Sequence, residues 1–324
     1  MSLGQSISGL FQRKVSATGL AVFRMLYSIM IIVEISLLYK FRHIIFDREP
    51  FVVPGEIDFG FIYFFWMAAL FALFVGLFTR VAALVNFIFG VIIFSSAIKF
   101  EYHIYYSYLG VNFLFLFLPV SKVFSLDNLI LKLKHTTIGK AFSPDRNVLE
   151  INYMMPVFVG IALVYFDSIF LKLQNNLWTS GLGFWLPTSI PAVAWNDMSL
   201  ILNQEWFMYF LGYFVLLFEA AFIFLFWFRK WRWPLLLIGI VFHLGIWVCY
   251  PIPLFALTYV FLYLLLLPAD FWQKTGQWFI SKNQVYTFYY DAECPLCNKV
   301  VVVIRHFDIF NRVICKTVQG NFQD

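Results

Sequence analysis

Two cysteines near the end of the chain have the spacing of a reactive dithiol. Cys294 and Cys297 form a Cys-x-x-Cys pair at the start of an apolar run that could be a helix. At a helix N-terminus, the dipole and the free backbone N–H groups would stabilise the thiolate of Cys294, which would attack a disulfide that Cys297 then resolves. Two alternatives stay open. One is a zinc site completed by His306 and Cys315, with a spacing unlike that of a zinc finger. The other is an inert remnant.

A lysine and an aspartate near the end of one apolar run are a second candidate for chemistry. Asp167 and Lys172 lie five residues apart. On a helix this offset is about 140° beyond a full turn, so we expect the two side chains to have different partners. Lys172 is either a snorkelling lysine, with its ammonium among lipid headgroups, or a buried general base.

Two further ionisable residues lie near the middle of successive apolar runs. Glu219 and His243 are expected at matching depth, where an ionisable side chain costs about 2.5–3.5 kcal/mol and needs a reason. Together they would form a proton relay or a substrate contact, or else a structural pair that joins two helices.

Arg24 and His103 lie close to the ends of apolar runs. We expect Arg24 to reach the membrane interface or to pair with a carboxylate in a structural role. His103 lies in a tyrosine-rich boundary that is typical of an aromatic belt, with a gate over an outer pocket as the alternative.

The composition decides what surrounds these residues. The 324-residue chain is 62% hydrophobic, 22% aromatic and 13% charged, and its mean hydropathy is +0.80. Soluble domains carry about twice that charged fraction, so the chain is predicted to be a polytopic membrane protein with the lipid bilayer as its solvent. The net charge of +5 lies in loops between apolar runs and does not indicate nucleic-acid binding.

Eight apolar segments are long enough to be considered as membrane spans, for which about 20 helical residues are needed. The predicted fold is therefore an all-α polytopic membrane bundle of about eight transmembrane helices. The segments are residues 20–39, 59–78, 81–98, 105–120, 151–171, 207–228, 234–250 and 253–267.

Charges in the loops predict the orientation. With the N-terminus inside, thirteen basic residues fall in inside loops and five in outside loops. This excess favours a multi-pass protein of a bacterial-type inner (cytoplasmic) membrane with both termini in the cytoplasm. The five outside residues are Lys40, Arg42, Arg48, Lys99 and Lys172.

The composition changes after Pro268, at the end of the bundle predicted for residues 1–268. Residues 269–284 read as an amphipathic connector, and residues 285–324 as an incomplete strand–helix–strand tail. Two strands and one helix cannot bury a core alone, so the tail either is a fragment or packs on something else.

An ordered set of four motifs in residues 10–268 resembles the HTTM (horizontally transferred transmembrane) domain, a relative of the membrane part of vitamin K-dependent γ-carboxylase. The four motifs are Leu20-Ala-Val-Phe-Arg24, Gly76-Leu-Phe-Thr-Arg80, Phe117-Leu-Pro-Val-Ser-Lys122 with Leu126-Asp127, and Phe242-His-Leu-Gly-Ile246. Separately, Tyr290-Asp291-x-x-Cys294-Pro-Leu-Cys297 resembles the start of the DCC family of thiol-disulfide oxidoreductase-like proteins. This second resemblance implies a thioredoxin-like tail of about 40 residues, roughly a third of such a domain.

The carboxylase resemblance implies a role for Lys172. The segment Tyr165-Phe-Asp-Ser-Ile-Phe-Leu-Lys172-Leu, followed by Trp178, is similar to the stretch that carries the family's base lysine, which activates vitamin K hydroquinone on the non-cytoplasmic side. The chain lacks the large extramembrane β-rich region that holds a protein substrate. Glutamate carboxylation is therefore not implied, whereas a pocket for a quinone-like molecule is.

Two functions follow as hypotheses. The first is an HTTM-type membrane enzyme that acts on a quinone, lipid or peptide from an outward-facing pocket, with a cytoplasmic Cys-x-x-Cys redox accessory served by a cytoplasmic thiol reductant. The alternative is a non-enzymatic membrane carrier, or a maturation or export partner with a structural tail.

Overall fold

The computed structural model describes residues 12–96, 104–138, 142–268, 271–272, 274–275, 285–308 and 312–320. The chain divides into two compact units. The first comprises Met1–Phe100, Phe115–Asn152 and Pro268–Asp324, and the second comprises Glu101–Leu114 and Tyr153–Leu267.

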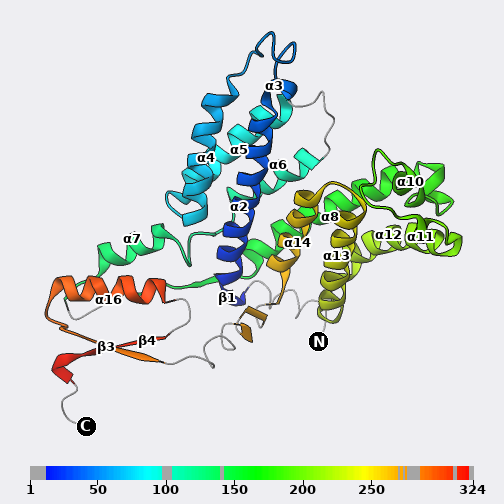
Figure 1. Cartoon of the computed structure of the whole chain (residues 1–324). Helices are drawn as coiled ribbons and strands as arrows, with labels where there is room; N and C mark the ends of the chain where they lie inside the picture. Colours follow the sequence, from blue (N-terminus) through cyan, green and yellow to red (C-terminus); the bar gives the residue numbers. More distant parts are fainter. Residues whose placement is uncertain are drawn as a thin grey trace. The chain divides into compact units, whose positions relative to one another are not determined.

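In the first unit, helix α4 packs against both α2 and α5, and a two-stranded antiparallel sheet joins β1 to β2 (Figure 1). Nothing in the sequence indicated this strand pairing, because each strand has only three residues. The elements before the tail are β1 (Lys14–Ser16), α2 (Thr18–Lys40), α3 (Arg42–Ile45), α4 (Phe59–Val75), α5 (Thr79–Ser96), α7 (Leu126–His135) and β2 (Asn147–Leu149).

In the second unit, α13 packs against α14 and α12, and three short helices connect α8 to α12. Helix α6 belongs to this unit as far as Leu114. The elements are α6 (Ile104–Phe115), α8 (Ile151–Leu173), α9 (Asn176–Thr179), α10 (Trp185–Ser189), α11 (Ser199–Leu202), α12 (Glu205–Leu225), α13 (Arg229–Cys249) and α14 (Pro253–Leu266).

The structure is a helical one with small sheets, and five of its described helices are long and apolar enough to cross a membrane: α2, α5, α8, α12 and α13. Helices α4 and α14 are apolar but shorter. Each of the eight predicted segments coincides with a helix, whereas a count of eight crossings stays a prediction.

Helix boundaries differ from the predicted ones for local reasons. Helix α4 ends at Val75 because Gly76 adopts a left-handed conformation, with a φ of 72°, that stops the helix three residues early. Helix α13 begins at Arg229, five residues before the predicted start, because its charged first turn is helical although not apolar. Pro234 is tolerated there because it lies close to the helix N-terminus.

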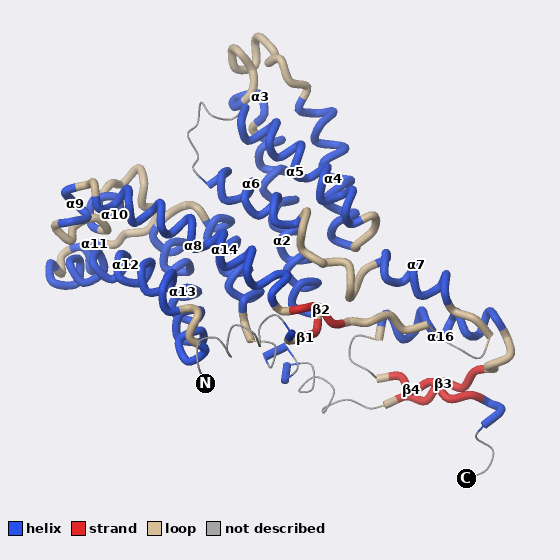
Figure 2. The backbone as a smooth tube through the Cα atoms, turned by 180° about the vertical axis from the view of Figure 1, so that it is seen from behind, coloured by secondary structure: helices blue, strands red, loops and turns tan. Residues whose placement is uncertain are grey.

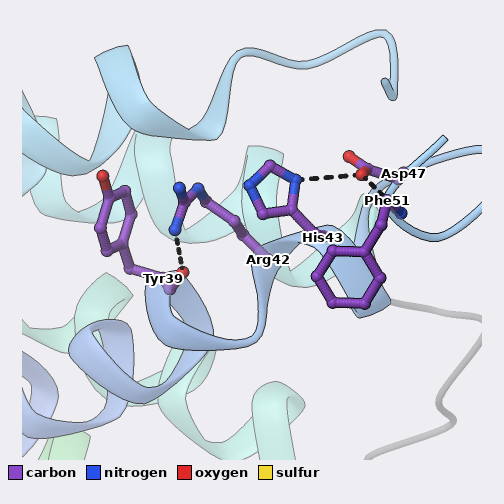
Figure 3. Close-up of polar contacts among 5 residues, drawn as sticks. All are labelled: Tyr39, Arg42, His43, Asp47 and Phe51. Carbon is purple, nitrogen blue, oxygen red and sulfur yellow. Dashed lines mark hydrogen bonds and ion pairs between the residues drawn. The ribbon is translucent and has the colours of Figure 1, made fainter. Parts of the chain in front are cut away.

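The turn after α2 is closed by polar contacts between neighbouring side chains (Figure 3). The Arg42 guanidinium lies 4.1 Å from the centre of the Tyr39 ring and donates a hydrogen bond to the carbonyl oxygen of Tyr39. Asp47 Oδ2 lies 3.0 Å from His43 Nδ1 and accepts a hydrogen bond from the backbone N–H of Phe51. This last contact holds Phe51 at a φ of 63°, a conformation that L residues rarely adopt.

The tail forms the predicted strand–helix–strand unit. Strands β3 (Tyr286–Tyr290) and β4 (Val313–Thr317) pair in parallel, with α16 (Pro295–Phe307) as the crossover and a short 3-10 turn at Val318–Gly320. Helix α16 also packs against α7, so the tail buries part of its surface on another element of the first unit (Figure 2). Of the two alternatives for the tail, packing on another element is therefore observed.

Candidate functional site

The central feature of the second unit is an ion pair between the end of α8 and the middle of α12. Lys172 Nζ donates to Glu219 Oε1 at 2.5 Å. The side chain of Glu219 is 4% exposed and that of Lys172 17%, so the pair lies largely inside the unit. In such surroundings an unpaired charge would be expensive, which explains why the two groups meet.

Two further side chains hold this ion pair. Ser168, one helical turn before Lys172, donates its hydroxyl to the same Glu219 oxygen at 3.1 Å. Trp178 of α9 places its ring 4.8 Å from Lys172 Nζ, which is a cation–π distance. The other carboxylate oxygen, Glu219 Oε2, is buried and has no hydrogen-bond partner among the described residues. It is the acceptor that this site leaves available.

Three glycines let the connecting segment pack closely enough to cover the pair. A Cβ at Gly212 of α12 would lie 2.0 Å from the carbonyl oxygen of Gly181, and Gly181 itself has a φ of 84°. A Cβ at Gly183 would lie 2.0 Å from the Trp178 ring. Any larger residue at these positions would push the segment, and Trp178 with it, away from Lys172.

A second polar cluster of the same unit surrounds His243. Its Nδ1–H donates to the carbonyl oxygen of Gly239 at 2.9 Å, which makes Nε2 the acceptor in the neutral ring. The ring stacks on Tyr259 at 4.5 Å and lies 5.4 Å from Tyr263. Tyr263 in turn shares a short hydrogen bond with Tyr165 of α8.

The two clusters are electrostatically connected. Lys172 interacts with His243, and Glu219 interacts with Tyr165, Tyr259 and Tyr263. The second unit therefore contains one continuous set of ionisable side chains, contributed by α8, α12, α13 and α14.

The structure changes the pairing predicted from matching depth. Glu219 pairs with Lys172 and not with His243, because α8 ends beside the middle of α12. Asp167 is exposed and has no hydrogen bond or ion pair with the described residues, so it takes no part in the site. His103, the proposed gate, lies outside the described residues.

Arg24 has a structural set of partners in the first unit. It is fully buried and donates to the carbonyl oxygens of Val120 at 2.9 Å and Phe124 at 2.5 Å. Neither of its predicted alternatives, the membrane interface or pairing with a carboxylate, describes these contacts, although the charge of Asp127 acts on it. Backbone carbonyls from the loop before α7 take the place of a carboxylate.

Three of the motifs quoted above meet around Arg24. Asp127 accepts hydrogen bonds from the backbone N–H of Phe78 at 2.8 Å and of Thr79 at 2.9 Å, and from the Thr79 hydroxyl at 2.6 Å. A Cβ at Gly76 would lie 2.6 Å from an Arg24 nitrogen. We call Arg24, Gly76, Thr79 and Asp127 the polar knot of the first unit.

The dithiol has the local geometry that its spacing predicts. Cys294 is the N-cap of α16, and its Sγ accepts the backbone N–H of Cys297 at 3.3 Å. Hydrogen bonding by the Cys297 thiol and then by its backbone N–H lowers the pKa of Cys294, while the Cys294 thiol raises the pKa of Cys297. Buried Asn298 donates to the carbonyl oxygens of Ala292 and Cys294 and holds the turn in place.

The zinc alternative is not assembled in the described part of the chain, which includes all four proposed ligands. No three His, Cys, Asp or Glu side chains there come together as a metal site. His306 instead lies with Nδ1 3.3 Å from Lys132 Nζ of α7, beside a cation that no metal ligand would tolerate well.

Several residues of these sites were missed or left without a role by sequence reasoning. Trp178 was noted only for the family likeness, and the weak signal for Ser168 was its position one turn before Lys172. Nothing in the sequence pointed to the Tyr165–Tyr263 contact, because it joins helices 98 residues apart.

Comparisons with family models, with curated proteins and with solved structures found no match to this chain. The geometry of the two units is therefore what supports any assignment of function.

Proposed function

We propose that this protein is an integral membrane enzyme of the HTTM type whose chemistry is proton transfer at the Lys172–Glu219 pair. The observation that carries the proposal is the buried ion pair, with one carboxylate oxygen left without a partner. An intramembrane ion pair that is held by further side chains and keeps a free acceptor is a functional-site candidate.

The pair can supply a base in one step. If the proton on Lys172 Nζ moves to Glu219 Oε1, the products are a neutral amine and a neutral carboxylic acid, and neither needs a counter-ion in low dielectric. The amine nitrogen then has a lone pair that can take a proton from a substrate. Ser168 and Trp178 would keep both groups in place during the transfer.

The substrate class that fits is a quinone-like molecule, a lipid or a peptide, reached from the non-cytoplasmic side. In this proposal α4, α6 and α14 cross the membrane in addition to the five long helices, which makes eight spans with both termini in the cytoplasm. The excess of basic residues in the loops on that side supports this orientation.

The tail would act as a cytoplasmic thiol-disulfide accessory of the DCC type. The Cys294 thiolate attacks a disulfide and releases one thiolate, and Cys297 then closes the intramolecular disulfide and releases the second thiol. A cytoplasmic thiol reductant restores the dithiol. The packing of α16 on α7 equally favours a structural tail, and loss of activity in Cys294→Ser would distinguish the two.

The test of the membrane activity uses the full chain in lipid nanodiscs with a lipid-soluble naphthohydroquinone and oxygen. We expect oxygen uptake that Lys172→Ala and Glu219→Gln each abolish. Asp167→Asn is the matched control, since Asp167 lies on the same helix as Lys172 but is exposed. Uptake by Lys172→Ala equal to that of the unmodified chain would exclude the proposed base.

A further inference from the structure

Helix α7 has two faces, and only one of them is covered by the tail. Asn128 and Leu129 are buried, and Lys132 contacts His306 of α16. At 100° per residue, Ile130, Leu131 and Lys134 lie on the roughly opposite side. Ile130 is 51% exposed and Leu131 42%, so a pair of large apolar side chains is left without cover on a short helix.

The position of α7 continues the membrane-facing surface of its own unit. The backbone N–H of Asp127 donates to the carbonyl oxygen of Gly76, and its carboxylate binds the first turn of α5. Helix α7 therefore begins at the turn between two apolar helices, α4 and α5. From there it runs sideways and does not continue their direction, as both views show (Figures 1 and 2).

Charge favours an anionic partner for this face. Lys122 and Lys134 are exposed, and so are Arg146 and His135 nearby. The acidic side chains of the same region are already engaged: Asp127 is bound by the start of α5, and Asp145 pairs with Lys14 at 3.5 Å. The free charge beside Ile130 and Leu131 is therefore positive.

Beyond the proposed enzyme site, we propose that α7 is an interfacial helix that lies in the anionic surface of the bilayer and holds the tail there. Ile130 and Leu131 insert among the acyl chains near the headgroups, while Lys134 and its basic neighbours bind lipid phosphates. Because α16 packs on the opposite face, the Cys294–Cys297 dithiol is presented close to the membrane surface. The partner is thus an anionic phospholipid headgroup layer.

Spin labelling of the full chain tests the insertion. In a variant with its four cysteines replaced by serine, Leu131→Cys carries a nitroxide in vesicles of phosphatidylcholine and phosphatidylglycerol. We expect the label to be relaxed by lipid-soluble oxygen and shielded from a water-soluble nickel chelate. The matched control is Ile314→Cys on β4, an exposed position of the tail that should remain open to nickel. Equal nickel accessibility at both sites would overturn the proposal.

Amide hydrogen exchange of the unmodified chain tests the role of charge without any cysteine replacement. We expect the amides of residues 126–138 to exchange about tenfold more slowly in nanodiscs that contain phosphatidylglycerol than in phosphatidylcholine alone. Lys134→Gln should reduce this difference, whereas Lys316→Gln, an exposed lysine of β4, should not. Exchange that is independent of lipid charge would exclude headgroup binding.

Discussion

The two units bury ionisable side chains in different ways. In the first unit, Arg24 donates to backbone carbonyl oxygens and Asp127 accepts mainly from backbone N–H groups, so the polar knot ties loops and helix starts together. In the second unit, Lys172 and Glu219 bind each other and leave one carboxylate oxygen free. A buried charge with backbone partners stabilises a fold, whereas one paired to another side chain can exchange a proton.

Removal of the Arg24 side chain is the most severe way to probe this difference. Arg24→Leu leaves the carbonyl oxygens of Val120 and Phe124 without their donor, and we expect a loss of about 2–4 kcal/mol of unfolding free energy. Thermal unfolding of the protein in detergent measures it. Arg80→Leu is the control, because Arg80 is exposed and donates to a single carbonyl, that of Leu116. Equal losses in the two variants would show that the knot carries no special weight.

The ion pair should behave as a replaceable unit, in contrast to the knot. Lys172→Met or Glu219→Leu alone leaves one buried charge unpaired, with an expected cost of about 1–3 kcal/mol, while the double variant should lie close to the unmodified chain. Unfolding in the same detergent gives the four corners of the cycle. Additive losses would mean that the two residues act independently.

The tail adds a third kind of site in which ionisation occurs outside the membrane. Burial, and then the charges of Lys132 and Arg146, lower the pKa of His306 to about 4. The unfolded histidine, with a pKa of 6.5, binds its proton first, so stability is complete above that pH and is lost as the pH falls toward 4. We expect a loss of about 1 kcal/mol, seen as faster amide exchange in α16 at acid pH.

Replacement of His306 separates this effect from general acid instability. His306→Leu should remove most of the pH dependence of exchange in α16, while His135→Leu, an exposed position on α7, should leave it intact. An unchanged pH profile in His306→Leu would show that another group controls the docking of the tail.

The smallest expected effect concerns the dithiol. Because hydrogen bonding by Cys297 lowers the pKa of Cys294, Cys297→Ala should raise that pKa and shift the pH profile of alkylation upward, with alkylation about threefold slower at neutral pH. Iodoacetamide modification of Cys294, followed by mass spectrometry, measures the rate. Cys315→Ala is the control, and a similar shift in that variant would argue against the Cys294–Cys297 contact as the cause.

Local chemistry accounts for what the sequence by itself determined. Apolar runs long enough for a membrane predicted every large helix, and the spacing of the cysteines predicted a thiol at a helix N-terminus. Such features depend on residues within a few turns of one another. The strand–helix–strand order of the tail was predictable for the same reason, because each element has its own periodicity.

Only the tertiary structure decided which charges meet. Equal distance along two helices suggested Glu219 and His243 as partners, but the register of α8 against α12 is set by how the Gly181–Gly212 contact seats the connecting segment, and it brings Lys172 to Glu219. The gathering of Arg24, Gly76 and Asp127 likewise depends on packing between segments about 50 residues apart. Register and packing between distant helices are collective properties, and no local pattern encodes them.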